Sequence, residues 1–147
     1  MSDQSEYTVV ITGGKKHYHR IRRLVHFATL QQGIEEQEAD IIERAVAEAC
    51  HNALYHKPAA PEDPSFELEL RLSDTAIVAV VRNRGEAFDF SGVKPFSIEH
   101  NFMEYKEGGL GIPIMKRLMD EVHYERETNE LNVVTLIKFI DGQPREE

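Results

Sequence analysis

The stretch that decides the fold runs from Phe66 to Arg82 and reads FELELRLSDTAIVAVVR. Its first part, Phe66–Leu72, alternates apolar and polar residues, which is the pattern of a half-buried β-strand. Its last part, Ala76–Arg82, is almost continuously apolar, as in a strand near the centre of a sheet. Because Ser73–Thr75 supplies turn-forming residues between them, the stretch predicts a β-hairpin.

The residues outside this hairpin predict helices that alternate with further strands. Strands are expected at Tyr7–Ile11, His123–Arg126 and Val133–Ile140, and helices at His17–Gln32, Glu35–His56 and Leu110–Val122. Because hairpins alternate with helices, we expect an α+β fold: a two-layer α/β sandwich with a mixed, mostly antiparallel sheet and helices on one face. The 147 residues have the usual size of one domain, which we expect to span 1–147.

Composition and charge exclude several classes of protein. The net charge of -9 disfavours binding to the nucleic-acid backbone. No apolar run approaches the ~20 residues that span a bilayer, and the first residues lack the pattern of a signal peptide. Cys50 is the single cysteine, so no internal disulfide can form. We expect it to be a packing residue on a helix rather than a reactive thiol. These features predict a cytoplasmic protein with neither a membrane nor a nucleic-acid partner.

Two basic clusters, Lys15–His17 and Arg20–Arg23, stand out against this negative background. Such clusters are typical of a solvated helix face. They would also suit a docking surface for an acidic protein. The sequence leaves both interpretations open.

Glu48 and Asn52 lie one turn apart on the second predicted helix. A projection at about 3.6 residues per turn places them at the edge of an apolar sector that includes Ala45 and Ala49, while Ala47 falls on the other side. Polar groups in such a position need partners. An Asn carbonyl suits Mg²⁺, and a nearby Glu could hold or deprotonate a nucleophile. The alternative is a Glu at the exposed rim and an Asn bonded to a loop backbone.

A glycine-rich turn, Glu107–Gly111, precedes the third predicted helix and reads EGGLG. Glycines let the backbone approach phosphate oxygens, and a helix N-terminus adds free N–H donors. A plain loop-to-helix connection is the alternative, and no Lys-Ser or Lys-Thr follows as in a Walker motif. Residues 90–107 lack any sustained period, and a connection this long is expected to be a lid.

A third segment, Arg82–Asp89, directly follows the most apolar strand. A polar residue at the end of a central strand, followed by glycine, is common in turns that face a ligand. Asn83, with Gly85 after it, could therefore hydrogen-bond the edge of a base. A simple β-turn is the alternative.

In this order and at these spacings, the three segments resemble the N, G1 and G2 boxes of Bergerat-fold ATPases, a superfamily that includes histidine-kinase catalytic domains. More narrowly, the chain resembles the bacterial anti-sigma-factor serine kinases from Tyr7 to Ile140. The most similar parts are Ala45–Ala53 and Gly108–Val122. Together the boxes are a much more specific signal than any one of them.

The resemblance implies that ATP binds between the helices, beneath a lid at about 90–107. It implies that Asn52 binds Mg²⁺ and that Glu48 is the catalytic base or positions water. The further nucleotide-binding positions that it implies are Asn83, Gly85, Ala87, Gly108, Gly109, Leu110, Gly111 and Asn132. The family's G1 box begins with Asp, whereas this chain has Asn83. The Asn carbonyl can still accept a hydrogen bond from the adenine amino group, although losing a charge-assisted bond costs roughly 1–3 kcal/mol.

The function implied by the resemblance is an ATP-dependent protein-serine kinase. Its substrate is expected to be an anti-anti-sigma partner of the STAS type, with a sigma factor as a further partner and a homodimer as the assembly. The alternative, motivated by Asn83, is a partner-switching binding module with weakened ATP binding and no kinase activity. A histidine-kinase fragment is less favoured, because no dimerisation helices with a phospho-acceptor His precede the domain.

Overall fold

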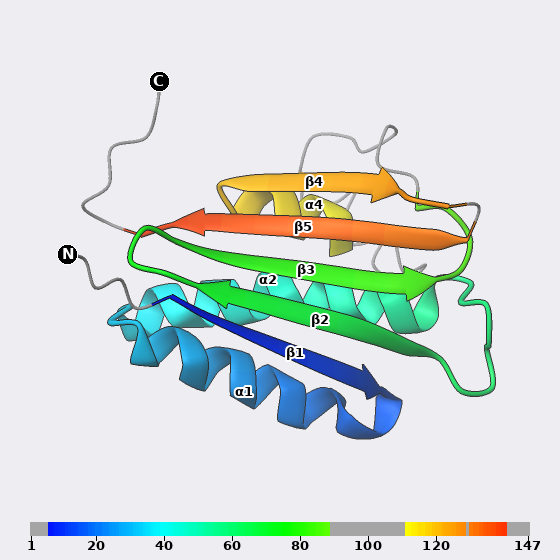
Figure 1. Ribbon diagram of the computed structural model, residues 1–147, viewed down its shortest axis with the longest axis horizontal. Helices are drawn as coiled ribbons and strands as arrows, with labels where there is room; N and C mark the ends of the chain where they lie inside the picture. Colours follow the sequence, from blue (N-terminus) through cyan, green and yellow to red (C-terminus); the bar gives the residue numbers. More distant parts are fainter. Residues whose placement is uncertain (1–5, 89–110, 129, 141–147) are drawn as a thin grey trace, which may run out of the picture.

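The computed structural model describes residues 6–88, 111–128 and 130–140 and confirms the α+β class (Figure 1). The strands are β1 (Tyr7–Gly14), β2 (Ser65–Leu72), β3 (Ala76–Arg84), β4 (Glu121–Arg126) and β5 (Leu131–Phe139). The helices are the 3₁₀ turn η1 (Lys15–His17), α1 (Tyr18–Gln31), α2 (Glu36–Tyr55) and α4 (Gly111–Leu118). No helix in these ranges is long and apolar enough to cross a membrane.

The described strands form one sheet in the order β1-β2-β3-β5-β4, and every neighbouring pair is antiparallel. The predicted hairpin is confirmed as β2 and β3, with Leu68 opposite Val81. β3 lies at the centre of the sheet and also pairs with β5, where Ala79 faces Leu136. This central position explains why the β3 sequence is nearly all apolar.

The helices α1, α2 and α4 all lie on one face of the sheet, as predicted (Figure 1). The alternation in β2 decides which face is covered, because successive side chains point to opposite sides. Phe66, Leu68, Leu70 and Leu72 are all buried toward the helices. Glu67 and Glu69 point to the uncovered face, where Arg82 lies beside both.

The predicted exposure of Ala47 on α2 is wrong, because that side chain is buried. α2 packs against the sheet on one side and against α1 on another, so two sides of the helix are covered. The Tyr18 hydroxyl of α1 donates to the Ala47 carbonyl at 3.1 Å. Cys50 is buried in the same α1–α2 interface, as the sequence predicted.

The third predicted helix is shorter than expected, since α4 ends at Leu118 and Val122 already belongs to β4. The chain leaves the helix at Asp120, whose N–H donates to the Ile137 carbonyl at 2.9 Å. The Asp120 carboxylate accepts from the Phe139 N–H at 2.7 Å. Pairing with β5 therefore overrides the helical pattern at this point.

Candidate functional site

Glu48 and Asn52 lie on the last turns of α2, where the helix crosses beneath the sheet. Asn52 is only 8% exposed, whereas the Glu48 side chain is 21% exposed. The Asn52 amide makes no hydrogen bond to any residue in the part of the chain that the structure describes. Both polar groups thus lie at the rim of the core.

Asn83 ties the end of β3 to the same turns of α2. Its Nδ2 donates to the Ala53 carbonyl at 3.4 Å and to the Arg84 carbonyl at 3.3 Å. Ala53 directly follows Asn52, so the structure brings the first and second predicted boxes together. Sequence spacing alone could not establish this juxtaposition, because about 30 residues separate the two sides of the contact.

The two carbonyls also fix the orientation of the Asn83 amide. Only the NH₂ group can face two acceptors, so the Oδ1 atom must point the other way. Oδ1 is buried, and it has no hydrogen-bond partner within the described ranges. An unsatisfied buried acceptor costs about 1–3 kcal/mol. A ligand that brings an N–H group to this acceptor, as the adenine amino group would, fits the chemistry of Asn83 Oδ1.

Gly85 allows a close approach between the loop after β3 and the segment after α2. A Cβ atom at this position would lie 2.8 Å from the Lys57 carbonyl oxygen and 3.1 Å from the Pro58 Cα. Gly85 forms an isolated β-bridge with Pro58, and its N–H donates to the Glu130 carbonyl at 2.9 Å. The position therefore requires glycine for reasons of packing, independently of any ligand.

Asn132 is fully buried on β5 and braces the loop that follows Gly85. Its Oδ1 accepts from the Tyr124 hydroxyl at 2.6 Å and from Arg126 Nη1 at 2.9 Å. Its Nδ2 donates to the Glu86 carbonyl at 2.9 Å. The contact between Asn132 and adenine that the resemblance implies stays a prediction, whereas the support of the loop is a feature of the fold.

Sequence reasoning missed Tyr124 and Arg126 as parts of this site. Both lie on β4 and point to Asn132, and Arg126 also donates to the Gly85 carbonyl at 2.8 Å. Their alternate spacing in a short strand was a usable signal, because residues i and i+2 share one face. Their target was invisible until the pairing of β4 with β5 was known.

Hydrogen bonds to backbone groups and packing of the Phe88 ring hold Ala87 and Phe88 in place. His56 Nε2 donates to the Ala87 carbonyl at 3.3 Å. The Phe88 ring packs between the rings of His56, at 5.2 Å, and Tyr124, at 5.6 Å. The Phe88 N–H donates to the Tyr124 hydroxyl at 3.1 Å. The predicted position Ala87 therefore belongs to a loop that is fixed before any ligand arrives.

The glycine-rich turn is described only from Gly111, which begins α4. Gly108, Gly109, Leu110 and the predicted lid at 90–107 lie outside the described residues. α4 packs against α2, and its Met115 is completely buried. The helix that follows the third box thus lies beside the helix that carries the first.

Glu48 has an ion-pair partner on α2 and lies near Tyr18 of α1. The Glu48 carboxylate lies 3.5 Å from Arg44 Nε, one turn earlier. Burial raises the pKa of Tyr18 to about 12; Arg22 opposes this effect, and the nearby Cys50 and Glu48 add to it. Tyr18 therefore remains protonated and keeps donating to α2.

The chain is similar to known proteins over most of its length. Residues 12–138 match a family model described as the histidine kinase-like ATPase domain. The chain is 28% identical to the serine-protein kinase RsbW of Bacillus subtilis, over 97% of this chain and 91% of that protein. It is 29% identical to RsbW of Bacillus licheniformis over the same shares. RsbW of Staphylococcus epidermidis is 33% identical over 65% of this chain and 62% of its own length.

These findings confirm the predicted fold and the resemblance from which it was inferred. The antiparallel sheet, with its helices on one face, agrees with the Bergerat fold. Within it, the ends of β3 and α2 meet at the buried amide of Asn83. Because the family match covers residues 12–138, most of the chain, this protein belongs to the histidine kinase-like ATPase domain family.

Proposed function

We propose that the protein is an ATP-dependent serine-protein kinase that phosphorylates an anti-anti-sigma partner of the STAS type and thereby regulates a sigma factor. Its similarity to the RsbW serine-protein kinases over 97% of the chain supports this proposal. The expected assembly is a homodimer. The expected ligands are ATP and Mg²⁺.

The buried Oδ1 of Asn83, which has no hydrogen-bond partner among the described residues, is the observation that carries the proposal. A fold that leaves a desolvated acceptor beside α2 gains free energy when a ligand supplies the missing donor. The adenine amino group is such a donor, and the carbonyl oxygen at O6 of guanine is not. We therefore expect the site to prefer ATP over GTP.

Asn52 and Glu48 are proposed to act on the phosphate side of the site. The Asn52 side-chain oxygen suits Mg²⁺, a hard ion that takes few protein ligands and keeps several waters. When bound, Mg²⁺ would neutralise charge on the phosphates, which is the main requirement of phosphoryl transfer. Glu48 is the proposed base for the acceptor serine hydroxyl, and Gly108, Gly109, Leu110 and Gly111 are proposed to face the phosphates.

The test is transfer of phosphate from ATP labelled at the γ position to a purified anti-anti-sigma partner of the STAS type. We expect Asn52→Ala to abolish transfer and Glu48→Gln to lower it by about 10²–10⁴-fold, the usual contribution of a general base. Glu38→Gln is the matched control, because Glu38 is a half-exposed carboxylate on the same helix, far from Asn83. No transfer by the native chain, or undiminished transfer by Asn52→Ala, would contradict the proposal.

The alternative function is a partner-switching module without kinase activity, and the neutral amide at Asn83 is the feature that favours it. Calorimetric titration of ATP with Mg²⁺ separates the two functions. Binding that disappears in Asn52→Ala supports the kinase. Partner binding that is unchanged by millimolar ATP and Mg²⁺ supports the module.

A further inference from the structure

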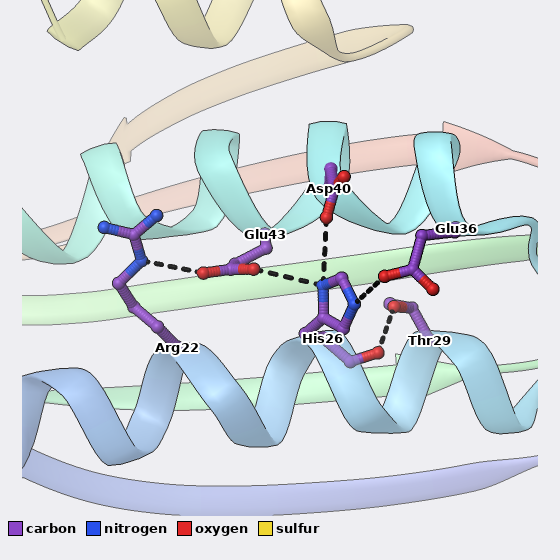
Figure 2. A network of polar contacts seen from close by, with 6 residues as sticks. All are labelled: Arg22, His26, Thr29, Glu36, Asp40 and Glu43. Carbon is purple, nitrogen blue, oxygen red and sulfur yellow. Dashed lines mark hydrogen bonds and ion pairs between the residues drawn. The ribbon is translucent and has the colours of Figure 1, made fainter.

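A polar network outside the proposed site joins the middle of α1 to the first half of α2 (Figure 2). His26 of α1 lies at its centre, and its side chain is 21% exposed. Its Nε2 is 3.1 Å from a Glu36 carboxylate oxygen, and its Nδ1 is 3.1 Å from a Glu43 oxygen. An Asp40 oxygen also lies 3.4 Å from Nδ1. Three carboxylates of α2 thus surround one imidazole of α1.

This geometry is that of an imidazolium cation. A neutral imidazole carries one N–H, so one of its ring nitrogens is an acceptor. Here both nitrogens face carboxylates, and an ionised carboxylate can only accept hydrogen bonds. A neutral His26 would therefore point a lone pair at either Glu36 or Glu43, whereas a protonated ring donates to both.

We propose that His26 is a proton-sensitive clamp that holds α1 on α2 while it is protonated and loosens when it loses its proton. The clamp is separate from the proposed kinase site. The free energy that holds α1 against α2 therefore changes with pH near neutrality, the range in which histidine titrates.

The charged groups around the ring favour retention of the proton. Within the described residues, Glu36, Asp40 and Glu43 face His26 from α2, and Arg22 is the neighbouring cation on α1. Arg22 Nε lies 2.9 Å from the second oxygen of Glu43, so it neutralises part of that charge. Three carboxylates against one arginine leave an excess of negative charge, which a proton on His26 reduces.

The direction of the pKa shift agrees with this geometry. Burial of the ring acts to lower the pKa of His26, but the hydrogen bond to Glu36 and the charges of Glu36, Glu43 and Asp40 outweigh it and raise the pKa above 6.5. For a base whose pKa is raised by folding, the stabilisation is complete below the unfolded pKa of about 6.5. It is lost as the pH rises through the pKa of the folded state.

The first test is an NMR titration of the histidine side chains in the native chain, with EDTA present so that no adventitious cation competes with the proton. We expect the His26 resonances to move with a midpoint above the ordinary value of about 6.5. Glu43→Gln should lower that midpoint, because it removes a facing carboxylate. A His26 midpoint at or below the ordinary value would overturn the proposal.

The second test compares the melting temperatures of the native chain and His26→Gln from pH 6 to pH 8.5. The variant keeps one N–H donor but cannot become charged, so it should be destabilised most at pH 6. That difference should shrink as the pH rises. His123→Gln is the matched control, because His123 is exposed and its ion pair with Glu121 lies within β4 rather than between helices. A deficit of His26→Gln that is the same at every pH would contradict the clamp.

Discussion

Substitution of Asn83 by Asp tests the geometry of the site directly. The wild-type amide donates to the carbonyls of Ala53 and Arg84, at 3.4 and 3.3 Å. A carboxylate in the same place would lose both donations and face two carbonyl oxygens instead. Family resemblance alone would favour Asp at this position, whereas the structure predicts that it destabilises this chain.

The magnitude follows from the burial of the residue. The two hydrogen bonds are long, so together they contribute about 1 kcal/mol. Placing a carboxylate that is only 4% exposed against two carbonyls adds about 1–3 kcal/mol. We therefore expect Asn83→Asp to lower the free energy of unfolding by about 2–4 kcal/mol at pH 7.5. For a chain of this size, that is a decrease in melting temperature of about 6–12 °C.

The pH dependence identifies the cause of this loss. Burial and the facing carbonyls should raise the pKa of the new carboxyl above its ordinary value of about 3.9. The folded state then binds more protons than the unfolded state, so the stability deficit grows as the pH rises. It should largely disappear toward pH 4, where a protonated carboxyl can donate to one of the carbonyls.

Thermal unfolding of the native chain, Asn83→Asp and Asn83→Leu between pH 4.5 and 8 is the assay. Asn83→Leu is the control, because it removes the two donations without adding a titratable group, so its deficit should not change with pH. Equal stability of Asn83→Asp and the native chain at pH 7.5, or a deficit of Asn83→Asp that does not depend on pH, would refute the reasoning. In the folded fraction, the charged acceptor should tighten ATP binding by up to about tenfold.

Three further substitutions test the packing around the site. Gly85→Ala should lower the free energy of unfolding by about 1–3 kcal/mol and weaken ATP binding, because its Cβ would lie 2.8 Å from the Lys57 oxygen. Denaturant unfolding and calorimetry measure the two effects, and unchanged ATP binding would show that the loop can shift freely. Asn132→Ala should cost about 2–4 kcal/mol in denaturant unfolding, because it removes the buried acceptor to which Tyr124 and Arg126 both donate. Met115→Ala should cost about 2–5 kcal/mol, since the side chain is fully buried, and a smaller loss would mean that the site collapses around the cavity.

Much of the fold could be predicted from local patterns. The alternation in Phe66–Leu72 and the apolar run after it identified the central hairpin, because a strand exposes its side chains to two different environments. The predictions that were wrong concern places where two elements meet. Ala47 was misplaced because α1 covers a second side of α2, and the helix before β4 was predicted too long because sheet pairing ends it at Asp120.

The sequence by itself determined the type and order of the elements and the residues that the family resemblance singles out, because these depend on local periodicity and on motifs. Only the tertiary structure decided what those residues touch. The donation from Asn83 to Ala53, the bracing of the loop by Asn132 and the ring of carboxylates around His26 all join distant segments. Such contacts depend on strand register and helix packing, which bring together side chains that no local pattern relates.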